Sequence, residues 1–336
     1  MPVTSREIRL KSRPVGEPSA ADFELATADV RDPAAGEVQV ENLWMSVDPY
    51  MRGRMYDRPS YVPPFELDKA LQGGAVGRVT ASGDDRFKPG DLVQSMMGWR
   101  ERFTAKADHL QPLETHGAPE QAFLGVLGMP GMTGWGGLLK IAQMKAGDVV
   151  FVSGAAGAVG QVVCQVAKLK GAAQVIGSAG GADKGAWLRE IGCDAVIDYK
   201  AEPDLKAALK REAPKGIDVY FDNVGGDHLE AAMDAARPFA RFAECGMISQ
   251  YNAETPEPGP SNMSLIVGKR LRLQGFIVSD LAEHQAEFAR EMGGWVRDGK
   301  LRWKETVDEG IESAPGAFIK LFRGGNTGKM LVKLAG

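Results

Sequence analysis

The chain has 336 residues, enough for two average domains, and its 44% apolar and 25% charged residues are typical of a soluble globular protein. A formal net charge of −4 and the lack of any Lys/Arg-rich run argue against a nucleic-acid-binding surface. Three widely spaced cysteines make no disulfide framework, and the N-terminus has no apolar signal-peptide core. No segment approaches the roughly 18 consecutive apolar residues of a membrane span. We therefore expect a cytoplasmic protein that binds neither membranes nor nucleic acid.

Residues 1–125 have the pattern of short strands joined by tight turns. The segments 37–47, 73–82 and 88–96 are rich in β-formers and are interrupted by Gly and Pro at short intervals. This spacing favours an irregular, barrel-like β domain over a helical one.

The pattern changes near Gly125, where strands and helices begin to alternate. Strands are expected at 149–152, 173–180, 195–199, 240–246 and 271–279, with one more at the start of 217–226. Helices are expected at 132–144, 158–171, 182–192, 204–214, 228–238 and 282–299. This alternation predicts βαβ units and a parallel sheet. Residues 253–264 are Pro-rich and are expected to form a loop, and after residue 300 the chain returns to short β segments with one helix.

A glycine-rich segment links the first strand of this region to its first helix. Gly154, Gly157 and Gly160 lie between them, but Ala155 stands where the first glycine of the G-x-G-x-x-G fingerprint would be. Gly157 would let the backbone approach a pyrophosphate, and Gly160 would let helix and strand pack closely. The helix N-terminus would attract the phosphates. The alternative is a small-residue turn of the kind found in any α/β protein.

The end of the following strand distinguishes NAD from NADP. In an NAD enzyme, an acidic residue about 20 positions after the glycine motif binds the ribose 2′-hydroxyl, whereas this chain has Ser178 at that position. The missing carboxylate removes a charge that would repel a 2′-phosphate. Lys184 offers a cation and Ser178 a hydroxyl, which favours NADPH; Asp183 is the alternative acid of a longer loop.

Several longer motifs together resemble the medium-chain dehydrogenase/reductase superfamily. Within it, the chain is most similar to the zinc-free group of prostaglandin reductases, plant alkenal double-bond reductases and bacterial curcumin reductases. The motifs that carry this resemblance span nearly the whole chain: SVDPYMRGRM (46–55), GMPGMTGWGGLL (128–139), GAAGAVGQVVCQVAKLKG (154–171), FDNVGG (221–226), CGMISQYN (245–252), LQGFIVSD (273–280) and GGNTGKMLVK (324–333).

The resemblance implies a two-domain α/β protein and a homodimer. A GroES-like β-barrel domain would comprise residues 1–125 and be completed by residues 301–336. A Rossmann NADP-binding domain with a doubly wound parallel sheet would comprise residues 126–300, with the active site between the two.

The resemblance also implies which residues contact NADPH. The glycine loop would contact the pyrophosphate, and a lysine and a tyrosine would contact the 2′-phosphate. Two loops would contact the ribose and nicotinamide. A backbone segment would contact the carboxamide, and an asparagine of the tail would close the site. These residues are Gly157, Ala158, Val159, Gly160, Lys184, Tyr199, Asn223, Cys245, Gly246, Met247, Ile248, Ser249, Gln250, Tyr251, Phe276, Ile277, Val278 and Asn326. One departure concerns Lys184: the family commonly has GSxEK where this chain has GGADK (180–184), after a strand that is one residue longer.

The ligand pattern of a zinc alcohol dehydrogenase is missing from the sequence. No cysteine precedes Cys164, and the four histidines are not spaced with Cys or with one another as zinc ligands are. SVDPY (46–50) and QGGAVG (72–77) stand where zinc-containing relatives have ligands. We therefore expect no metal.

A hydride donor that works without a metal suits a substrate that is already electrophilic. In an α,β-unsaturated ketone or aldehyde, hydride adds to the β carbon and negative charge moves to the carbonyl oxygen, where hydrogen-bond donors are needed. Tyr251 is the first candidate for this donor, and Tyr56 is a candidate for the substrate wall. For both tyrosines the alternative is simple packing or cofactor contact.

Three functions are consistent with these residues. The first is an NADPH-dependent, zinc-independent reductase of enones and alkenals. The second is an NADPH quinone reductase of the same superfamily, and the third is a non-catalytic NADPH-binding protein. Cofactor-binding residues alone do not separate them.

Overall fold

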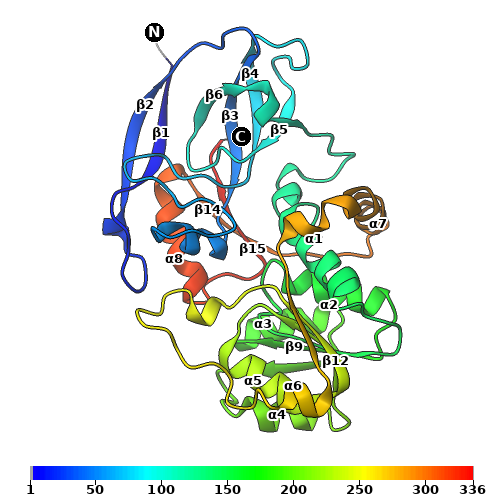
Figure 1. Cartoon of the computed structure of the whole chain (residues 1–336). Coiled ribbons are helices and arrows are strands. Elements are labelled where there is room, and N and C mark those ends of the chain that lie inside the picture. Colours follow the sequence, from blue (N-terminus) through cyan, green and yellow to red (C-terminus); the bar gives the residue numbers. More distant parts are fainter. Residues whose placement is uncertain (1–2, 336) are drawn as a thin grey trace. The chain divides into compact units, whose positions relative to one another are not determined.

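The computed structural model describes residues 3–335 (Figure 1). Its contacts divide the chain into two compact units. The first contains the described residues up to Leu124, the segment Glu305–Asn326 and the residues from Met330 on. The second contains Gly125–Lys304 and Thr327–Lys329. None of the helices within residues 3–335 is long and apolar enough to cross a bilayer.

The first unit is built mainly from antiparallel strands. β1 (Val3–Leu10) and β2 (Phe23–Val30) form a two-stranded sheet. The strands of a second sheet are β3 (Glu37–Ser46), β4 (Ala75–Ser82), β5 (Leu92–Ser95), β6 (Arg102–Lys106), β7 (Gln111–Pro112), β14 (Glu305–Glu309) and β15 (Lys329–Lys333). Their order is β14-β15-β3-β4-β5-β7, with β6 paired to β3.

The C-terminal part of the chain completes the core of this unit. α8 (Ala314–Phe322) buries Phe318 in the same cluster as Phe23 and Trp99. Phe23 stacks on Trp99 with the ring centroids 6.2 Å apart, and Phe318 meets both rings edge-on. Burying such aromatic side chains stabilises a fold by several kcal/mol, about 3–5 each by alanine truncation, so the C-terminal segment is an integral part of this core.

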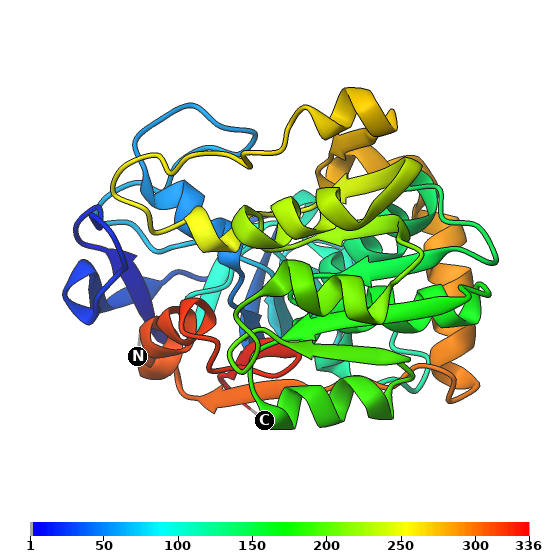
Figure 2. The ribbon, with the colours of Figure 1, turned by 90° about the horizontal axis from the view of Figure 1, so that it is seen from below.

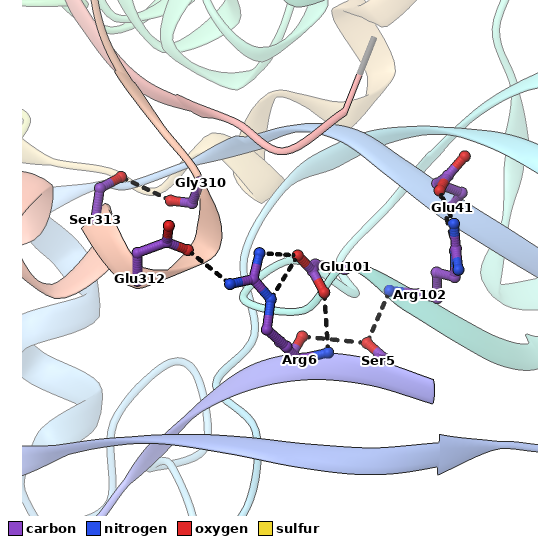
Figure 3. Close-up of polar contacts among 8 residues, drawn as sticks. All are labelled: Ser5, Arg6, Glu41, Glu101, Arg102, Gly310, Glu312 and Ser313. Atoms are coloured by element: carbon purple, nitrogen blue, oxygen red, sulfur yellow. Dashed lines mark hydrogen bonds and ion pairs between the residues drawn. The ribbon is translucent and has the colours of Figure 1, made fainter. Parts of the chain in front are cut away.

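A surface ion-pair cluster joins the same parts of the chain. In Figure 3 the Arg6 guanidinium of β1 lies between Glu101 and Glu312, with Nη2 2.6 Å from Glu101 Oε1 and Nη1 3.1 Å from Glu312 Oε2. Arg6 is largely exposed, so solvent screens these pairs and they add little to stability. The buried aromatic cluster therefore contributes far more than this ion pair to holding the C-terminal segment in place.

The second unit has a six-stranded sheet whose described strand pairs are all parallel. Its strands are β8 (Val149–Val152), β9 (Gln174–Ala179), β10 (Ala195–Asp198), β11 (Ile217–Asp222), β12 (Ala236–Glu244) and β13 (Arg272–Gly275). They lie in the order β10-β9-β8-β11-β12-β13, which in chain order is 3-2-1-4-5-6, the doubly wound order of a Rossmann fold. The fold predicted for this half of the chain is confirmed.

Helices cover both faces of this sheet (Figure 2). They are α1 (Met129–Gly136), α2 (Gly160–Leu169), α3 (Ala182–Glu190), α4 (Leu205–Glu212), α5 (Gly226–Ala235), α6 (Leu265–Lys269) and α7 (Gln285–Arg297). α4, α5 and α6 share one buried cluster with alternate strand residues such as Phe151, Tyr220 and Phe242, while α2 and α3 contact β8, β9 and β10. Successive side chains of a strand point to opposite faces, so strands covered on both sides are apolar throughout, as the four buried residues of β8 are.

Two of the predicted boundaries near the end of the sheet differ from the structure. The strand expected at 240–246 begins at Ala236, so Pro238 lies inside β12. The strand tolerates it because its register shifts beside Ile217 and Phe239 has a left-handed φ of 67°, the signs of a bulge. The strand expected at 271–279 is β13 and ends at Gly275, after which a 3₁₀ helix runs from Val278 to His284.

Candidate functional site

The glycine-rich segment forms the turn between β8 and α2. Gly154 has a left-handed φ of 56°, so it supplies the conformation that the fingerprint assigns to a glycine at 155. Ala155 is fully buried and its amide donates to Ser178 O at 2.9 Å. A Cβ on Gly177 would come within 3.0 Å of the Ala155 methyl group. Ala155 therefore packs the loop onto β9, and the turn itself is made one residue earlier.

Gly160 begins α2 and has no room for a side chain. A Cβ there would lie 2.5 Å from Gly154 O and 2.6 Å from Ala155 Cα. The close approach brings the N-terminus of a ten-residue helix to the loop, with the positive end of its dipole. This combination suits the binding of a pyrophosphate.

A short segment of the tail lies beside the glycine loop within the second unit. Gly157 and Gly328 form an isolated parallel bridge, and Gly328 N donates to Ala156 O at 2.7 Å. Gly328 has a φ of 71°, and a Cβ there would lie 1.8 Å from Lys304 O. Asn326, which the resemblance assigns to the cofactor, lies two positions before Gly328 in the sequence.

Two lysines and a tyrosine gather beyond the ends of β9 and β10. Lys184 lies in the first turn of α3, where burial and the charge of Lys200 lower its pKa. Tyr199 follows β10, its ring meets His228 edge-on at 5.3 Å, and burial raises its pKa. A Cβ on Gly180 would lie 2.9 Å from both Lys200 Cε and Tyr199 Cζ. Lys200 is thus a further candidate for the 2′-phosphate, one that sequence reasoning missed although it follows Tyr199 directly.

The other polar residues near this end have structural partners. The Ser178 hydroxyl is fully buried and lies 2.7 Å from His228 Nε2, so it faces inward rather than toward a ligand. Asp198 Oδ1 accepts hydrogen bonds from the amides of Gly181 and Lys200 at 3.0 and 3.1 Å. Asp183, the alternative ribose ligand, is exposed on the first turn of α3.

The loops after β11 and β12 are hydrogen-bonded to each other and to the glycine loop. Asn223 donates from its backbone N to Ser153 Oγ at 2.9 Å and from Nδ2 to Ser153 O at 2.7 Å. Cys245 N and Gly246 N donate to Asp222 O, and Ser249 Oγ donates to Val224 O at 2.6 Å. The residues assigned to the ribose and nicotinamide, from Asn223 to Tyr251, are therefore held in one network.

Tyr251 and Cys245 have distinct environments in the second of these loops. The Tyr251 hydroxyl oxygen lies 3.0 Å from where a Cβ on Gly246 would be and accepts a hydrogen bond from Met247 N at 3.3 Å. That contact uses a lone pair of the oxygen and not its proton. Burial, with the charges of Asp222 and Glu244, raises the pKa of the Cys245 thiol to about 12, so it stays protonated and is a poor nucleophile.

The segment after β13 begins with Phe276, whose ring meets Phe221 edge-on at 6.2 Å. Ile277 N donates to Asp280 Oδ2 at 2.9 Å and Ile277 O accepts from Asp280 N at 3.0 Å. The backbone of Ile277 is therefore already engaged, which leaves Phe276 and Val278 as the stronger candidates for a carboxamide contact.

The strand order places these groups in a sequence that matches a dinucleotide. The lysines and Tyr199 follow β9 and β10, the glycine loop follows β8, and the remaining candidates follow β11, β12 and β13. The carboxyl ends of parallel strands lie at one edge of a sheet, and the order reverses between β8 and β11, where α/β proteins bind ligands. The candidates for binding phosphate therefore lie at one end of the row and the nicotinamide candidates at the other.

Tyr56, the substrate candidate, belongs to the first unit. Its ring has the Arg52 guanidinium at 4.1 Å and that of Arg58 at 4.6 Å from the centroid, as cation–π contacts. Arg52 is itself fully buried and donates from Nη2 to the carbonyls of Pro14 and Gly16. Separately, residues 3–335 contain no cluster of three His, Cys, Asp or Glu side chains that could hold a metal ion.

Two acids near the nicotinamide candidates were not identified from the sequence: Asp222, which is fully buried, and Glu244, which is half-buried with its carboxyl oxygens covered. Asp222 ends β11 and Glu244 ends β12, and the two are partners in the parallel register. Glu244 carried a signal, since it is an acid in the otherwise apolar segment Phe242–Cys245. Asp222 lies within the FDNVGG motif, but only its side-chain contacts show its importance.

Fold and site together define an oxidoreductase of the dinucleotide-binding type, and comparisons identify its family. Residues 6–113 match the model of an N-terminal domain of oxidoreductase, and residues 158–297 match that of a zinc-binding dehydrogenase. The NADPH-dependent curcumin reductase of Escherichia coli is 42% identical over 97% of this chain and 96% of its own. The NADP⁺-dependent 2-alkenal reductase of Nicotiana tabacum is 40% identical over 99% of this chain and 98% of its own.

A solved structure agrees with these relatives. The crystal structure of CurA from Vibrio vulnificus in complex with NADPH superimposes with a TM-score of 0.93 at 41% identity, covering 98% of this chain and 99% of that one. The chain belongs to the zinc-free reductase group of the medium-chain dehydrogenase/reductase superfamily. The predicted family and the predicted combination of a Rossmann domain with a GroES-like β-barrel domain are confirmed.

Proposed function

We infer that the protein is an NADPH-dependent reductase of carbon–carbon double bonds conjugated to a carbonyl group. One observation supports this function: the candidates for the 2′-phosphate, the pyrophosphate and the nicotinamide follow one another along one edge of the sheet. Relatives of the chain are named as a curcumin reductase and a 2-alkenal reductase. Its cofactor is NADPH, as in the superimposed CurA complex.

We propose that the residues at this edge hold NADPH. Gly154 makes the turn with its left-handed φ, and the missing side chain at Gly160 brings the N-terminus of α2 close to this turn, where the pyrophosphate would bind. Lys184, Tyr199 and Lys200 would bind the 2′-phosphate, because two cations and a hydroxyl near a dianion form charge-assisted hydrogen bonds. Asn223, the run Cys245–Tyr251, Phe276–Val278 and Asn326 would contact the ribose and nicotinamide.

Reduction of the double bond requires a hydrogen-bond donor at the substrate oxygen. When bound, NADPH supplies the hydride. We propose that Tyr251 donates a hydrogen bond from its O–H to the carbonyl oxygen, where negative charge develops as the double bond is reduced. Its contact with Met247 N holds the ring in place without using that proton. A neutral tyrosine is a suitable donor because its usual pKa is about 10.

We propose that the first unit supplies the substrate wall and the second the cofactor site, with domain boundaries near residues 125 and 300. Tyr56 would line the wall, since its ring orientation is set by two guanidinium groups. The tail contributes α8 to the core of the first unit, and the segment Thr327–Lys329 that follows α8 belongs to the second unit.

We also propose a homodimer in the cytoplasm. β13 is the edge strand of the parallel sheet, and its residues Gln274 and Gly275 are exposed. An exposed edge of this kind readily pairs with the same strand of another copy. Light scattering after size-exclusion chromatography should give twice the monomer mass; a monomer would contradict the dimer.

An acceptor screen tests the proposed function. NADPH consumption is measured with an alkenal, an enone of larger size and a quinone, and the reduced products are identified by mass spectrometry. Saturation of the C=C bond is expected for the alkenal and the enone. Turnover of quinones alone would favour the quinone reductase, and tight NADPH binding without turnover of any acceptor would favour the non-catalytic binding protein.

A further inference from the structure

Three polar side chains whose oxygen atoms are buried form a row across the sheet, next to a layer of aromatic rings. Phe151, Tyr220 and Phe242 lie side by side on β8, β11 and β12, with centroid separations of 5.2 and 5.3 Å. Two residues further on, the same face carries Ser153, Asp222 and Glu244. This row lies at the carboxyl ends of the strands, directly below the loops assigned to the nicotinamide side.

Asp222 is the centre of this row and is fully buried. Its Oδ1 accepts hydrogen bonds from Ser153 Oγ at 2.9 Å and from Tyr220 OH, Val224 N and Gly225 N at 2.8 Å each. Its backbone oxygen accepts from Cys245 N and Gly246 N. Asp222 therefore holds the start of the glycine loop, the turn after β11 and the loop after β12.

The other oxygen of Asp222 faces a second acid. Asp222 Oδ2 and both carboxyl oxygens of Glu244 are buried without a hydrogen-bond partner if both groups are ionised. The two residues are register partners on β11 and β12 and point to the same face of the sheet, so their carboxyl groups are neighbours and interact. Two adjacent buried carboxylates would repel each other strongly, whereas one proton between them supplies the missing donor.

The surroundings decide which acid carries the proton. Four donors converge on Asp222 Oδ1 and stabilise its ionised form, while Glu244 receives no hydrogen bond from the described residues. We propose that Glu244 is a neutral carboxylic acid that donates to Asp222 Oδ2, and that this bond is a positioning contact for the two loops holding the nicotinamide half of NADPH. The inference rests on the proposed function, because it takes those loops as the nicotinamide site.

The titration of the surrounding groups is consistent with this assignment. Burial, then the charge of Asp222, raises the pKa of Glu244 to about 9. Glu244 interacts electrostatically with Asp222, Tyr220 and Cys245, and His228 on α5 interacts with Asp222. Burial raises the pKa of Tyr220, raises that of Cys245 to about 12 and lowers that of His228. Around pH 9, Glu244 is therefore the member of this cluster that changes charge.

The sign of the pH effect follows from the raised pKa. The folded protein keeps the Glu244 proton up to about pH 9, whereas an unfolded glutamate loses it at about pH 4.3. The bond to Asp222 is intact below pH 9 and is lost as the pH rises through that value. Two adjacent carboxylates then push the ends of β11 and β12 apart, and the affinity for NADPH falls.

The test compares two variants and two ligands by fluorescence or calorimetric titration. Glu244→Gln keeps a neutral donor of the same shape, and Glu244→Leu removes the donor without adding charge. NADPH reports on the whole site, whereas adenosine 2′,5′-bisphosphate reports on the phosphate end alone. The second ligand is the internal control, since Lys184, whose pKa is lowered by burial and by the charge of Lys200, lies at that end.

At pH 7 the dissociation constant of NADPH should change less than about twofold in Glu244→Gln and rise about tenfold in Glu244→Leu, the usual effect of one unsatisfied buried acceptor. The bisphosphate should bind both variants as it binds the unchanged protein. Between about pH 8 and 10 the unchanged protein should lose NADPH affinity about tenfold more than Glu244→Gln, which lacks the titrating acid.

Several outcomes would overturn the proposal. One is an NADPH affinity of Glu244→Leu equal to that of the unchanged protein. Another is an equal loss of NADPH affinity at alkaline pH in the unchanged protein and in Glu244→Gln, which would point to Lys184 as the titrating group. If Glu244→Leu does not fold, the comparison of pH profiles with Glu244→Gln decides alone. Failure of the unchanged protein to bind either ligand would instead contradict the proposed function.

Discussion

At the scale of single residues, the proposed chemistry assigns the hydrogen bond to the substrate oxygen to one phenol. Tyr251 lies in the loop after β12, and its oxygen accepts from Met247 N. We expect Tyr251→Phe to lower kcat for an enone by about 100-fold, the effect of losing one donor to a developing oxyanion. NADPH affinity should change less than about threefold, because a hydroxyl contributes little to binding a cofactor held at many points.

Stopped-flow measurement of NADPH oxidation separates the two quantities. Tyr56→Phe is the matched comparison, since Tyr56 also loses a hydroxyl but keeps the ring between Arg52 and Arg58. It should raise the KM for substrate and leave kcat nearly unchanged. Equal kcat values in Tyr251→Phe and the unchanged protein would remove Tyr251 from the mechanism.

At the same scale, we propose that two lysines determine the preference for NADPH. Lys184 and Lys200 are close enough for their charges to interact, which lowers the pKa of Lys184 beyond the effect of burial. A bound 2′-phosphate would relieve this repulsion. We expect Lys200→Ala and Lys184→Ala each to weaken NADPH binding about tenfold or more while leaving NADH binding within about twofold.

Isothermal titration with both cofactors measures this ratio. Lys210→Ala is the control, since Lys210 is an exposed lysine of α4. An unchanged NADPH/NADH ratio in Lys184→Ala would show that the 2′-phosphate is bound elsewhere.

At the scale of secondary-structure elements, the contact of α2 with β8 shapes the loop. A methyl group on Gly160 would overlap Gly154 O and Ala155 Cα at 2.5 and 2.6 Å. We therefore expect Gly160→Ala to displace the helix N-terminus, to lower the free energy of unfolding by about 1–3 kcal/mol and to weaken NADPH binding by about tenfold or more.

A glycine in the middle of α7 provides the control for this substitution. A Cβ on Gly293 would meet no other atom within 4 Å, so Gly293→Ala should be neutral or stabilise the protein by up to about 1 kcal/mol. Urea denaturation and NADPH titration on both variants check the contrast. Normal cofactor affinity in Gly160→Ala would mean that the pyrophosphate does not use this loop.

At the scale of the whole molecule, the C-terminal segment completes a core that begins with β1. Phe318 of α8 is fully buried against Phe23, Trp99 and Phe322. We expect Phe318→Ala to lower the free energy of unfolding by about 3–5 kcal/mol, as for other large aromatic truncations in cores.

Val15→Ala is the control, because Val15 belongs to the same unit and is 81% exposed. It should change stability by less than about 0.5 kcal/mol. Chemical denaturation followed by near-UV circular dichroism measures both. A small loss in Phe318→Ala would show that the first unit is stable without the packing of α8.

The secondary-structure elements and the family can be predicted from the sequence alone. The periodicity of apolar residues reflects burial, so the alternation of strands and helices after Gly125 predicts the parallel sheet. The spacing of Gly154, Gly157 and Gly160 predicts a phosphate-binding loop. Long motifs such as FDNVGG and CGMISQYN identify the superfamily because they combine backbone requirements with cofactor contacts. The start of β12 at Ala236 is not predicted, since a bulge at Phe239 lets the strand pass through a proline.

The tertiary structure is needed to show which polar groups act together. The folded domain brings together three pairs of polar residues that are separated in the chain: Lys184 and Lys200, Ser178 and His228, and Asp222 and Glu244. From the sequence, the Ser178 hydroxyl is expected to face a phosphate. In the structure it is hydrogen-bonded to His228 of α5 in the interior of the domain. Whether a polar side chain meets a ligand or another residue depends on register and burial, which local sequence does not encode.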